Sequence, residues 1–443
     1  MEGCSMRKQS NLVLLGLVIL LFSILTACSA DSNKKSLGDN EASKNDDVVE
    51  LTFWKAEDVG RADYQAFMDV VEKFNEEHPD IDLKVDTTPN ADYRTRLNTQ
   101  AAGGQLPDVF QVWPGAELEP LVEGGVVQPI NDIINYWIEE TGLLDAEDFE
   151  DFSVDGEAYA VPANTNPTHM IFYDKDMLAD AGYEEFPSTY EEFLQLIDNL
   201  NANDITPIAL GNSDAWVLQS VYISTIADRF TGNDFLEGVA NGERAFTDSD
   251  FVQSLEVIDE LVKRDAFNVD LNTIDSSQMI DYFLQGRAAM VIDGNWGISA
   301  ILENMPEDKN IGVDMIPLND KKTISTVAGT GVAINSDLEG EKLEAAHTFL
   351  RYVYNQELWE ELIKVGRPVI ANVEVPEGAE LHPLQQEMLA LIAESDPAPV
   401  YDATLIPAVN DQLENELQSI TVGGSTPQEA ADNIQRVQES EQK

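Results

Sequence analysis

The sequence predicts an α/β fold of mostly parallel sheets, because short β-branched runs alternate with longer segments of helical periodicity from residue 48 onward. A succession of strand, helix, strand, helix and strand requires right-handed crossovers, which place helices on both faces of a parallel sheet. Hydrophobic residues make up 43% of the 443 residues, which is enough for two or three domain cores. We therefore expect a multidomain α/β protein.

The first elements follow one another closely. A buried strand is expected at residues 48–54, and apolar residues at three-and-four spacing predict a helix over 64–74. That helix should end at His78-Pro79, since proline disfavours helix in the preceding residue. The next elements in order are a strand at 81–85, a polar helix from Asp92 to Gly103 and a strand at 107–113.

Further elements are predicted by turn chemistry and by apolar runs. The dipeptide Asp155-Gly156 favours a tight turn and predicts a hairpin over 154–162. Later we expect strands at 170–173, 288–292 and 332–334, and a pair of helices over 341–365. No repeat of the solenoid type is found.

The amino-terminal segment has the pattern of an export signal. Arg7 and Lys8 precede an apolar run over 12–25 that is too short for a stable membrane span, so residues 1–27 read as a cleavable leader. The small residues before Cys28 resemble the lipobox of bacterial lipoproteins, which predicts a lipidated cysteine; the alternative is an ordinary signal peptide that contains a cysteine. Met6 is an alternative start of translation.

Residues 28–47 are expected to form a flexible tether, because they are almost wholly polar and cannot build a core. No disulfide is expected, since Cys4 would leave with the leader and Cys28 would carry lipid.

The formal net charge of the chain is −56. Such a field repels nucleic acid and anionic lipid headgroups, so neither is expected as a partner. The acidic residues are spread along the chain, which is typical of a solvated surface suited to a saline or alkaline exterior. Scattered calcium sites are the alternative, although Asp248-Ser249-Asp250 lacks the glycine and the final glutamate of an EF-hand loop.

Tryptophans fall where ligands bind in open α/β sheets, which is outside the carboxyl ends of strands. Trp54 and Trp113 fall at the carboxyl ends of predicted strands, Trp296 follows the predicted strand at 288–292, and Trp216 is expected on a loop. The other two tryptophans, Trp137 and Trp359, lie within amphipathic helical patterns and are expected to pack in a core.

Several segments, in their order and spacing, resemble a known family. They are Leu51-Thr52-Phe53-Trp54, 106–113 followed by 121–125, Tyr159-Ala160-Val161-Pro162 followed by Tyr173-Asp174-Lys175, 288–296, and Thr426-Pro427-Gln428-Glu429-Ala430. With the leader, they make nearly the whole mature chain similar to the family 1 extracellular solute-binding proteins. These are lipid-anchored receptors of bacterial ABC sugar importers and are distantly similar to maltose-binding protein.

The resemblance implies a two-lobe periplasmic-binding-protein-like fold of type II, with each lobe a mostly parallel sheet flanked by helices and a ligand cleft between the lobes. The implied divisions are an N-terminal lobe of 48–164 plus 323–372, a C-terminal lobe of 165–322 plus 373–437, and a polar tail of 438–443. Crossings between lobes are implied near 162–167 and near 317–325. Hinge closure over the ligand would carry the signal to the transporter.

The implied ligand is a sugar, and several tryptophans favour an oligosaccharide. Pyranose faces stack on flat aromatic rings, while polar side chains satisfy the rim of hydroxyls. The predicted ligand contacts are Trp54, Trp113, Trp216, Trp296, Asp293, Arg367, Asn166, Glu57, Asn212, Tyr401 and Asp402. Each tryptophan could instead be a core or surface residue, and Asp293 could instead cap the turn that follows it. Exposed or capping roles also remain open for Glu57, Asn166, Asn212, Tyr401 and Asp402.

The resemblance further implies two permease subunits and a cytoplasmic ATPase as partners, a monomer anchored at the extracytoplasmic face of the membrane, and no cofactor or metal. An enzyme is the main alternative. None of the four histidines has the spacing of a zinc or hydrolase motif, and neither a G-x-S-x-G elbow nor a P-loop is present. A surface glycoside hydrolase would need a carboxylate pair, which the sequence cannot nominate. A lipid-anchored adhesin or structural protein is the third class.

Overall fold

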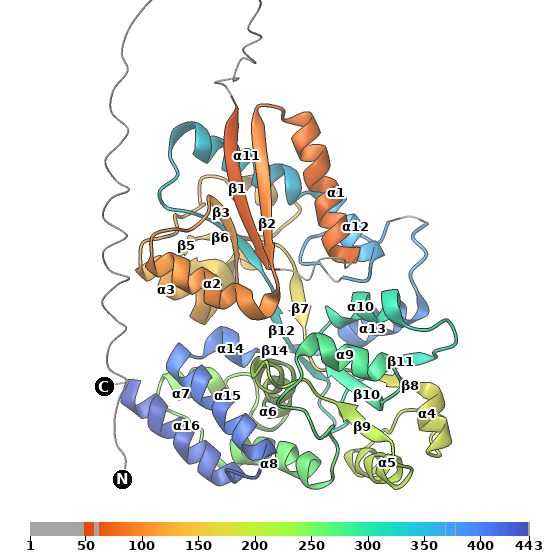
Figure 1. The fold of residues 1–443 in the computed structure, drawn as a ribbon. Helices are drawn as coiled ribbons and strands as arrows, with labels where there is room; N and C mark the ends of the chain where they lie inside the picture. The colour runs from red at the N-terminus through yellow and green to blue at the C-terminus, as the bar shows by residue number, and fades with distance from the viewer. Residues whose placement is uncertain (1–47, 57–61, 368, 377, 442–443) are drawn as a thin grey trace, which may run out of the picture. The chain divides into compact units, whose positions relative to one another are not determined.

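Figure 1 shows the computed structural model of the chain, which describes residues 48–56, 62–367, 369–376 and 378–441. The predicted leader and tether, Cys28 and Glu57 all lie outside these residues. Within the described part of the chain, no helix combines the length and the apolar character needed to cross a membrane.

The first sheet has the strand order β2-β1-β3-β13-β6. Its strands are β1 (Val49–Ala56), β2 (Ile81–Thr88), β3 (Val109–Val112), β6 (Ala160–Pro162) and β13 (Gly331–Ile334). The first three pair in parallel, as the sequence predicts, whereas β13 runs antiparallel to both β3 and β6. The expectation of a mostly parallel sheet is therefore wrong in its second half, because β13 enters the sheet from the crossing strand β12 rather than through a helical crossover.

The second sheet has the order β11-β8-β10-β9. Its strands are β8 (Met170–Asp174), β9 (Thr206–Ala209), β10 (Ala288–Asp293) and β11 (Ile311–Asp314). Only β9 and β10 are parallel, so this sheet is mixed as well. All six side chains of β10 are buried, which agrees with the apolar run over 288–292 that predicts this strand.

A third sheet, β14-β12-β7, is built from the crossing segments. It contains β7 (Thr165–Pro167), β12 (Thr323–Ala328) and β14 (Asp396–Ala398), and Figure 1 shows β7 and β12 where the chain passes between the first and second sheets. Strand β7 pairs antiparallel with β12, and β12 pairs in parallel with β14. Segments that are far apart in the sequence are thus held side by side at the crossing.

Helices cover both main sheets. The α-helices before β12 are α1 (Ala62–Glu77), α2 (Asn90–Ala102), α3 (Leu118–Glu123), α4 (Lys175–Asp180), α5 (Tyr190–Ala202), α6 (Ser224–Thr231), α7 (Phe235–Ala240), α8 (Ser249–Lys263), α9 (Ser276–Leu284) and α10 (Gly297–Asn304). Those after it are α11 (Gly340–Val353), α12 (Gln356–Lys364), α13 (Pro383–Ala393), α14 (Tyr401–Thr404), α15 (Pro407–Thr421) and α16 (Pro427–Glu441). Short 3-10 or π-helices are η1 (Gly115–Glu117), η2 (Tyr136–Glu140), η3 (Ala146–Phe152) and η4 (Val217–Ile223).

Separate hydrophobic cores lie around the two main sheets. One gathers buried side chains between Leu51 and Ala163 with others between Val332 and Ala371, and a smaller cluster around Phe110 and Tyr93 adjoins the same sheet. The core of the second sheet combines side chains from 170–316 with side chains from 384–434. The polar residues from 438 onward, expected as a tail, continue α16 as far as Glu441.

Two local predictions are confirmed. Strands β4 (Ser153–Val154) and β5 (Glu157–Ala158) form the hairpin, and its turn has φ values of 53° at Asp155 and 83° at Gly156, which a tight turn of this kind requires. Trp137 and Trp359 are fully buried, and their indole nitrogens donate to the carbonyls of Tyr354 and Ala163.

Candidate ligand-binding site

On the first sheet, Tyr93 holds two tryptophan segments together. Its hydroxyl donates to the carbonyl oxygens of Trp54, at 3.1 Å, and of Gln111, at 2.9 Å, and its ring meets Trp113 edge to face at 5.8 Å. Trp54 lies within β1, two residues before the strand ends, whereas Trp113 directly follows β3. Both indoles are half-buried, so each ring keeps part of its surface accessible.

Each of these rings is covered on one side by an arginine from α2. The guanidinium carbon of Arg96 lies 3.7 Å from the ring centroid of Trp54, and that of Arg94 lies 4.6 Å from Trp113. Arg96 is fixed by hydrogen bonds to Asp86 and Thr88, and Arg94 by an ion pair with Glu117 at 2.9 Å. A planar cation over an aromatic face both stabilises and orients the ring.

On the second sheet, Trp216 and Trp296 form a contiguous aromatic corner. Their centroids are 5.8 Å apart with an interplanar angle of 60°, and both are half-buried. Trp216 precedes η4 and Trp296 precedes α10, so both side chains project where a helix begins. The Trp296 ring lies over Gly294, where a Cβ atom would be only 2.2 Å from two ring carbons. Glycine is therefore required beneath this indole.

Asp293 ends β10 directly before that turn and is 2% exposed. Its Oδ1 accepts a hydrogen bond from the backbone N–H of Gly294, and its carboxylate packs against Gly297, where a Cβ would lie 2.6 Å from Oδ2. The capping role that the sequence allowed is thus present. Its charge contributes to a raised pKa of the nearby Tyr222 hydroxyl, for which burial is the larger cause.

A direct contact joins the two tryptophan regions. Gly115 in η1, just after Trp113, packs so closely on α14 that a Cβ would lie 1.8 Å from the carbonyl oxygen of Ala403. Helix α14 also contacts η4, which begins after Trp216. The segments that carry Trp113 and Trp216 are therefore bridged by α14.

Acidic groups gather at this bridge around Arg94. Burial raises the pKa of Glu117, and Asp402 raises it further, while Arg94 lowers it. Burial also raises the pKa of Glu414 in α15 to about 7, and here too Arg94 opposes the shift while Asp402 and Asp411 add to it. One guanidinium thus faces several partly buried carboxyls, which favours groups that can neutralise or hydrogen-bond them.

The remaining predicted residues occupy varied positions. Asn166 lies on the crossing strand β7, and Asp402 is half-buried beside Ala403 at the bridge. Arg367 is 8% exposed, with its Nε 3.6 Å from the Asp63 carboxylate of α1. The arginine that the family resemblance points to is therefore buried and oriented by a carboxylate of α1.

Asn212 and Tyr401 are both buried. Asn212 is fully buried, and its Nδ2 donates to Asn272 at 2.7 Å inside the second core. The Tyr401 ring is 1% exposed and stacks on Phe251 with an interplanar angle of 10°. These placements give both side chains packing partners, and their role as ligand contacts stays a prediction.

Sequence reasoning missed the residues that orient the aromatic rings. Arg94, Arg96 and Tyr93 act through contacts with strands that lie elsewhere in the chain, as does Asn295, which sits beside Trp296. One signal was available: arginines at 94 and 96 are notable in a chain with 26 basic against 82 acidic residues.

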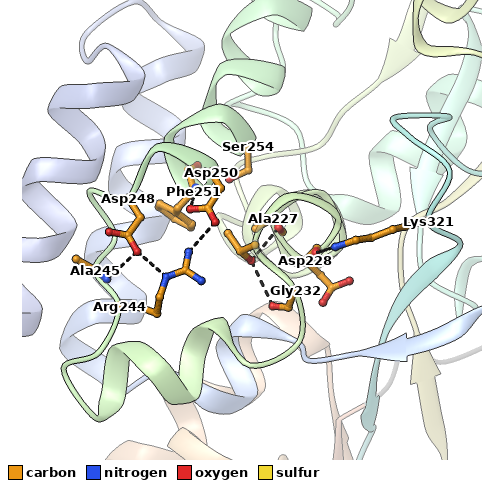
Figure 2. A network of polar contacts seen from close by, with 11 residues as sticks. Ala227, Asp228, Gly232, Arg244, Ala245, Asp248, Asp250, Phe251, Ser254 and Lys321 are labelled. Carbon is orange, nitrogen blue, oxygen red and sulfur yellow. Dashed lines mark hydrogen bonds and ion pairs between the residues drawn. The ribbon is translucent and has the colours of Figure 1, made fainter.

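The acidic stretch considered for calcium has a different role. Figure 2 shows Arg244 between the carboxylates of Asp248 and Asp250, with both hydrogen bonds at 2.6 Å. A guanidinium therefore occupies the place that a cation would take.

Figure 2 also shows the side chain of Lys321, whose Nζ donates to the backbone carbonyl of Asp228 in α6 at 3.2 Å. In the part of the chain that the structure describes, no cluster of three or more potential metal ligands is found.

Comparison with known proteins gives concordant matches. A family model described as bacterial extracellular solute-binding protein matches residues 59–358. The multiple sugar-binding protein of Streptococcus mutans is 22% identical over 86% of this chain and 87% of its own length. The diacetylchitobiose binding protein DasA of Streptomyces coelicolor is 23% identical over 78% of this chain and 77% of its own length.

Solved structures match over nearly their full length. A chitin oligosaccharide binding protein superposes with a TM-score of 0.81 and 26% identity, covering 89% of this chain and 99% of that chain. A maltose-bound MalE3 of T. maritima superposes with a TM-score of 0.73 and 18% identity, covering 89% of this chain and 100% of that chain. These matches confirm the periplasmic-binding-protein-like fold of type II that the sequence resemblance implied.

Proposed function

This chain belongs to the family of bacterial extracellular solute-binding proteins, and we propose that it captures a sugar, in particular an oligosaccharide, for an ABC importer. The observation that carries the proposal is the pair of aromatic surfaces, Trp54 with Trp113 and Trp216 with Trp296, joined through the contact of η1 with α14. Aromatic rings present flat apolar faces that suit the C–H faces of pyranose rings. The names of the relatives, which bind chitin oligosaccharides, diacetylchitobiose or multiple sugars, support this ligand class.

Polar groups beside the aromatic surfaces would satisfy the sugar hydroxyls. Asp293, Asn166 and Asp402 remain proposed contacts, and we add Glu117 and Glu414 because they lie near Trp113 and Arg94. Arg367 is proposed as a donor that Asp63 orients. A carboxylate accepts two hydrogen bonds from adjacent hydroxyls, and such charge-assisted bonds are stronger than neutral ones.

We propose that the lobes comprise 48–164 plus 323–372 and 165–322 plus 373–437, and that they close over the sugar about the sheet β14-β12-β7. The separate cores around the two main sheets support this division, since each would move as a packed unit. The closed form would then be the one that two permease subunits recognise, with a cytoplasmic ATPase driving transport.

The proposal also includes a lipid anchor at Cys28 and a monomer at the extracytoplasmic face of the membrane. The lipobox-like residues before Cys28 support the anchor. Mass spectrometry of the membrane-extracted protein tests it: a diacylglycerol-modified Cys28 as first residue is expected, and an unmodified amino terminus elsewhere would contradict it.

The function is proposed to be binding without catalysis. We would test residues 48–443 by thermal shift and tryptophan fluorescence against diacetylchitobiose, maltotriose, xylo-oligosaccharides, monosaccharides, polyols and peptides. A sugar that raises the melting temperature, changes the fluorescence and is recovered intact after overnight incubation is the expected outcome. Consumption of the sugar would instead indicate a glycoside hydrolase, and a response to peptides alone would overturn the sugar assignment.

A further inference from the structure

The turn between β10 and α10 is tied to the crossing strand β7 by one residue, Asn295. Its side chain is fully buried. Its backbone N–H donates to the carbonyl of Pro167 and its Nδ2 donates to the carbonyl of Thr165, both at 3.0 Å. The two acceptors flank Asn166, so Asn295 spans the whole length of β7 (Thr165–Pro167).

Strand β7 is part of the crossing itself. It pairs antiparallel with β12, and this pairing continues into the second lobe through Thr168, whose N–H donates to Ser325 at 2.8 Å. On the first-lobe side, the Asn164 side chain accepts a bond from the backbone N–H of Thr330 at 2.9 Å. Any change in the path of β7 must therefore change the hydrogen bonds of the hinge strands.

The residue that follows Asn295 in the sequence is Trp296. Its indole rests on Gly294 and meets the ring of Trp216, so its orientation depends on the backbone of the 294–296 turn. That backbone is held from within by the bond from Gly294 to Asp293 and from outside by the bonds of Asn295 to β7. The 294–296 turn thus both carries the Trp296 ring and is hydrogen-bonded to the crossing strand β7.

We propose that Asn295 is a positioning residue that couples the orientation of Trp296 to the conformation of the hinge strand β7. This inference rests on the proposed function, in which Trp296 contacts the sugar and β7 belongs to the hinge. Seating of a sugar on Trp296 would shift the 294–296 turn, and the two hydrogen bonds of Asn295 would transmit that shift to Thr165 and Pro167. Rigid coupling through a short, fully buried link is effective because packed interiors deform little.

A purely structural role is the alternative, because a buried asparagine that bonds backbone carbonyls also stabilises a fold. The matched control is Asn268, which is 2% exposed, accepts from Leu210 N–H and donates to Asp270, each at 2.8 Å, so that its side chain bonds to groups outside the crossing strands. Asn295→Ala and Asn268→Ala should both lower the melting temperature. Only Asn295→Ala should alter β7.

Hydrogen–deuterium exchange of peptides covering 163–170 and 323–330 gives a readout that needs no sugar. We expect exchange at least tenfold faster in Asn295→Ala than in the wild type, and little change in Asn268→Ala. Trp296→Ala should also speed exchange in these peptides, but it should add nothing in an Asn295→Ala background, because the link is already absent. Unchanged exchange in Trp296→Ala, or full addition of the two effects in the double variant, would overturn the coupling.

If Asn295→Ala does not fold, Asn295→Asp keeps the shape while replacing the donor at Thr165 by a carboxylate, and the same exchange pattern is expected. A second arm adds diacetylchitobiose or maltotriose and follows the radius of gyration by small-angle scattering. We expect compaction of the wild type and of Asn268→Ala, and less compaction of Asn295→Ala at equal occupancy. Equal compaction would overturn the proposal, whereas failure of every sugar to bind the wild type would count against the proposed function and leave the exchange result to decide the coupling.

Discussion

The indole rings of Trp216 and Trp296 meet edge to face, with their centroids 5.8 Å apart. They come from the starts of different helices, η4 and α10, and each ring packs against the other. Two rings at an angle of 60° form a corner, which can contact one sugar ring by its face and the next by its edge. Loss of either ring should therefore weaken sugar binding both by removing its own contact and by loosening the position of the other ring.

Replacement of either ring tests this corner. Trp296→Ala and Trp216→Ala should each weaken sugar affinity about tenfold, or about 1.4 kcal/mol, and the double variant should lose less than the sum because the rings support one another. Isothermal titration calorimetry measures this. Tyr183, a partly buried aromatic in the segment that follows α4, provides the control, and Tyr183→Ala should bind normally. Affinity of Trp296→Ala within twofold of the wild type would refute the stacking role.

The stack of Arg96 on Trp54 leads to a second prediction. Arg96→Ala should redshift the Trp54 emission and weaken sugar affinity about threefold, because the guanidinium at 3.7 Å holds the ring so that only its opposite face is offered. Arg96→Lys keeps the charge but not the planar stack, so its sugar affinity should lie between those of the wild type and Arg96→Ala. Arg287 lies at the same 3.7 Å from Tyr282 on another helix, so Arg287→Ala is a matched control. Equal effects of both alanine variants on affinity would show a general loss of stability instead.

Contact between η1 and α14 can be tested with two glycines. Gly115 and Gly125 have φ values of 60° and 65°, so alanine strains both backbones by about 1 kcal/mol. Only at Gly115 does the new Cβ collide with Ala403, whereas nothing lies within 4 Å at Gly125. Gly115→Ala should therefore enlarge the radius of gyration and weaken sugar binding at least tenfold, and Gly125→Ala should only lower the melting temperature. Similar scattering curves for the two variants would contradict a role of this contact in closure.

Glu414 predicts a dependence of stability on pH. Its pKa is raised from the usual 4.5 to about 7 by burial, so the folded protein binds this proton more tightly than the unfolded chain. Stability from this group is therefore greatest below pH 4.5 and falls as pH rises from there to about 7. Above that range the ionised carboxyl lowers the free energy of unfolding by on the order of 2 kcal/mol.

Glu414→Gln should consequently raise the melting temperature at pH 8 and change it little at pH 5. The measurement is differential scanning calorimetry at both pH values. Glu256 lies on an exposed face of α8, so Glu256→Gln removes the same charge from an exposed position. Its effect on the melting temperature should be small and similar at pH 5 and pH 8. A stabilisation by Glu414→Gln that is equal at pH 5 and pH 8 would contradict the raised pKa.

Local chemistry in the sequence was sufficient for most elements of this fold. The Asp155-Gly156 turn, the strand at 288–292 and the burial of Trp137 depend on neighbours within a few residues, where turn preferences and apolar periodicity act directly. The family could also be inferred, because the order of such local segments is itself a property of the sequence. The four tryptophans that stand at strand ends or helix starts were found in the same way.

Tertiary structure alone decided which distant groups meet. The sequence could not place Arg96 over Trp54, bury Tyr401 against Phe251, or bring Gly115 against Ala403, since each pair joins residues from segments whose proximity depends on the path of the chain. The antiparallel direction of β13 has the same origin, because it follows from the route through the crossing. Periodicity determines what a segment buries, whereas the free energy of packing the whole chain determines against which partner it is buried.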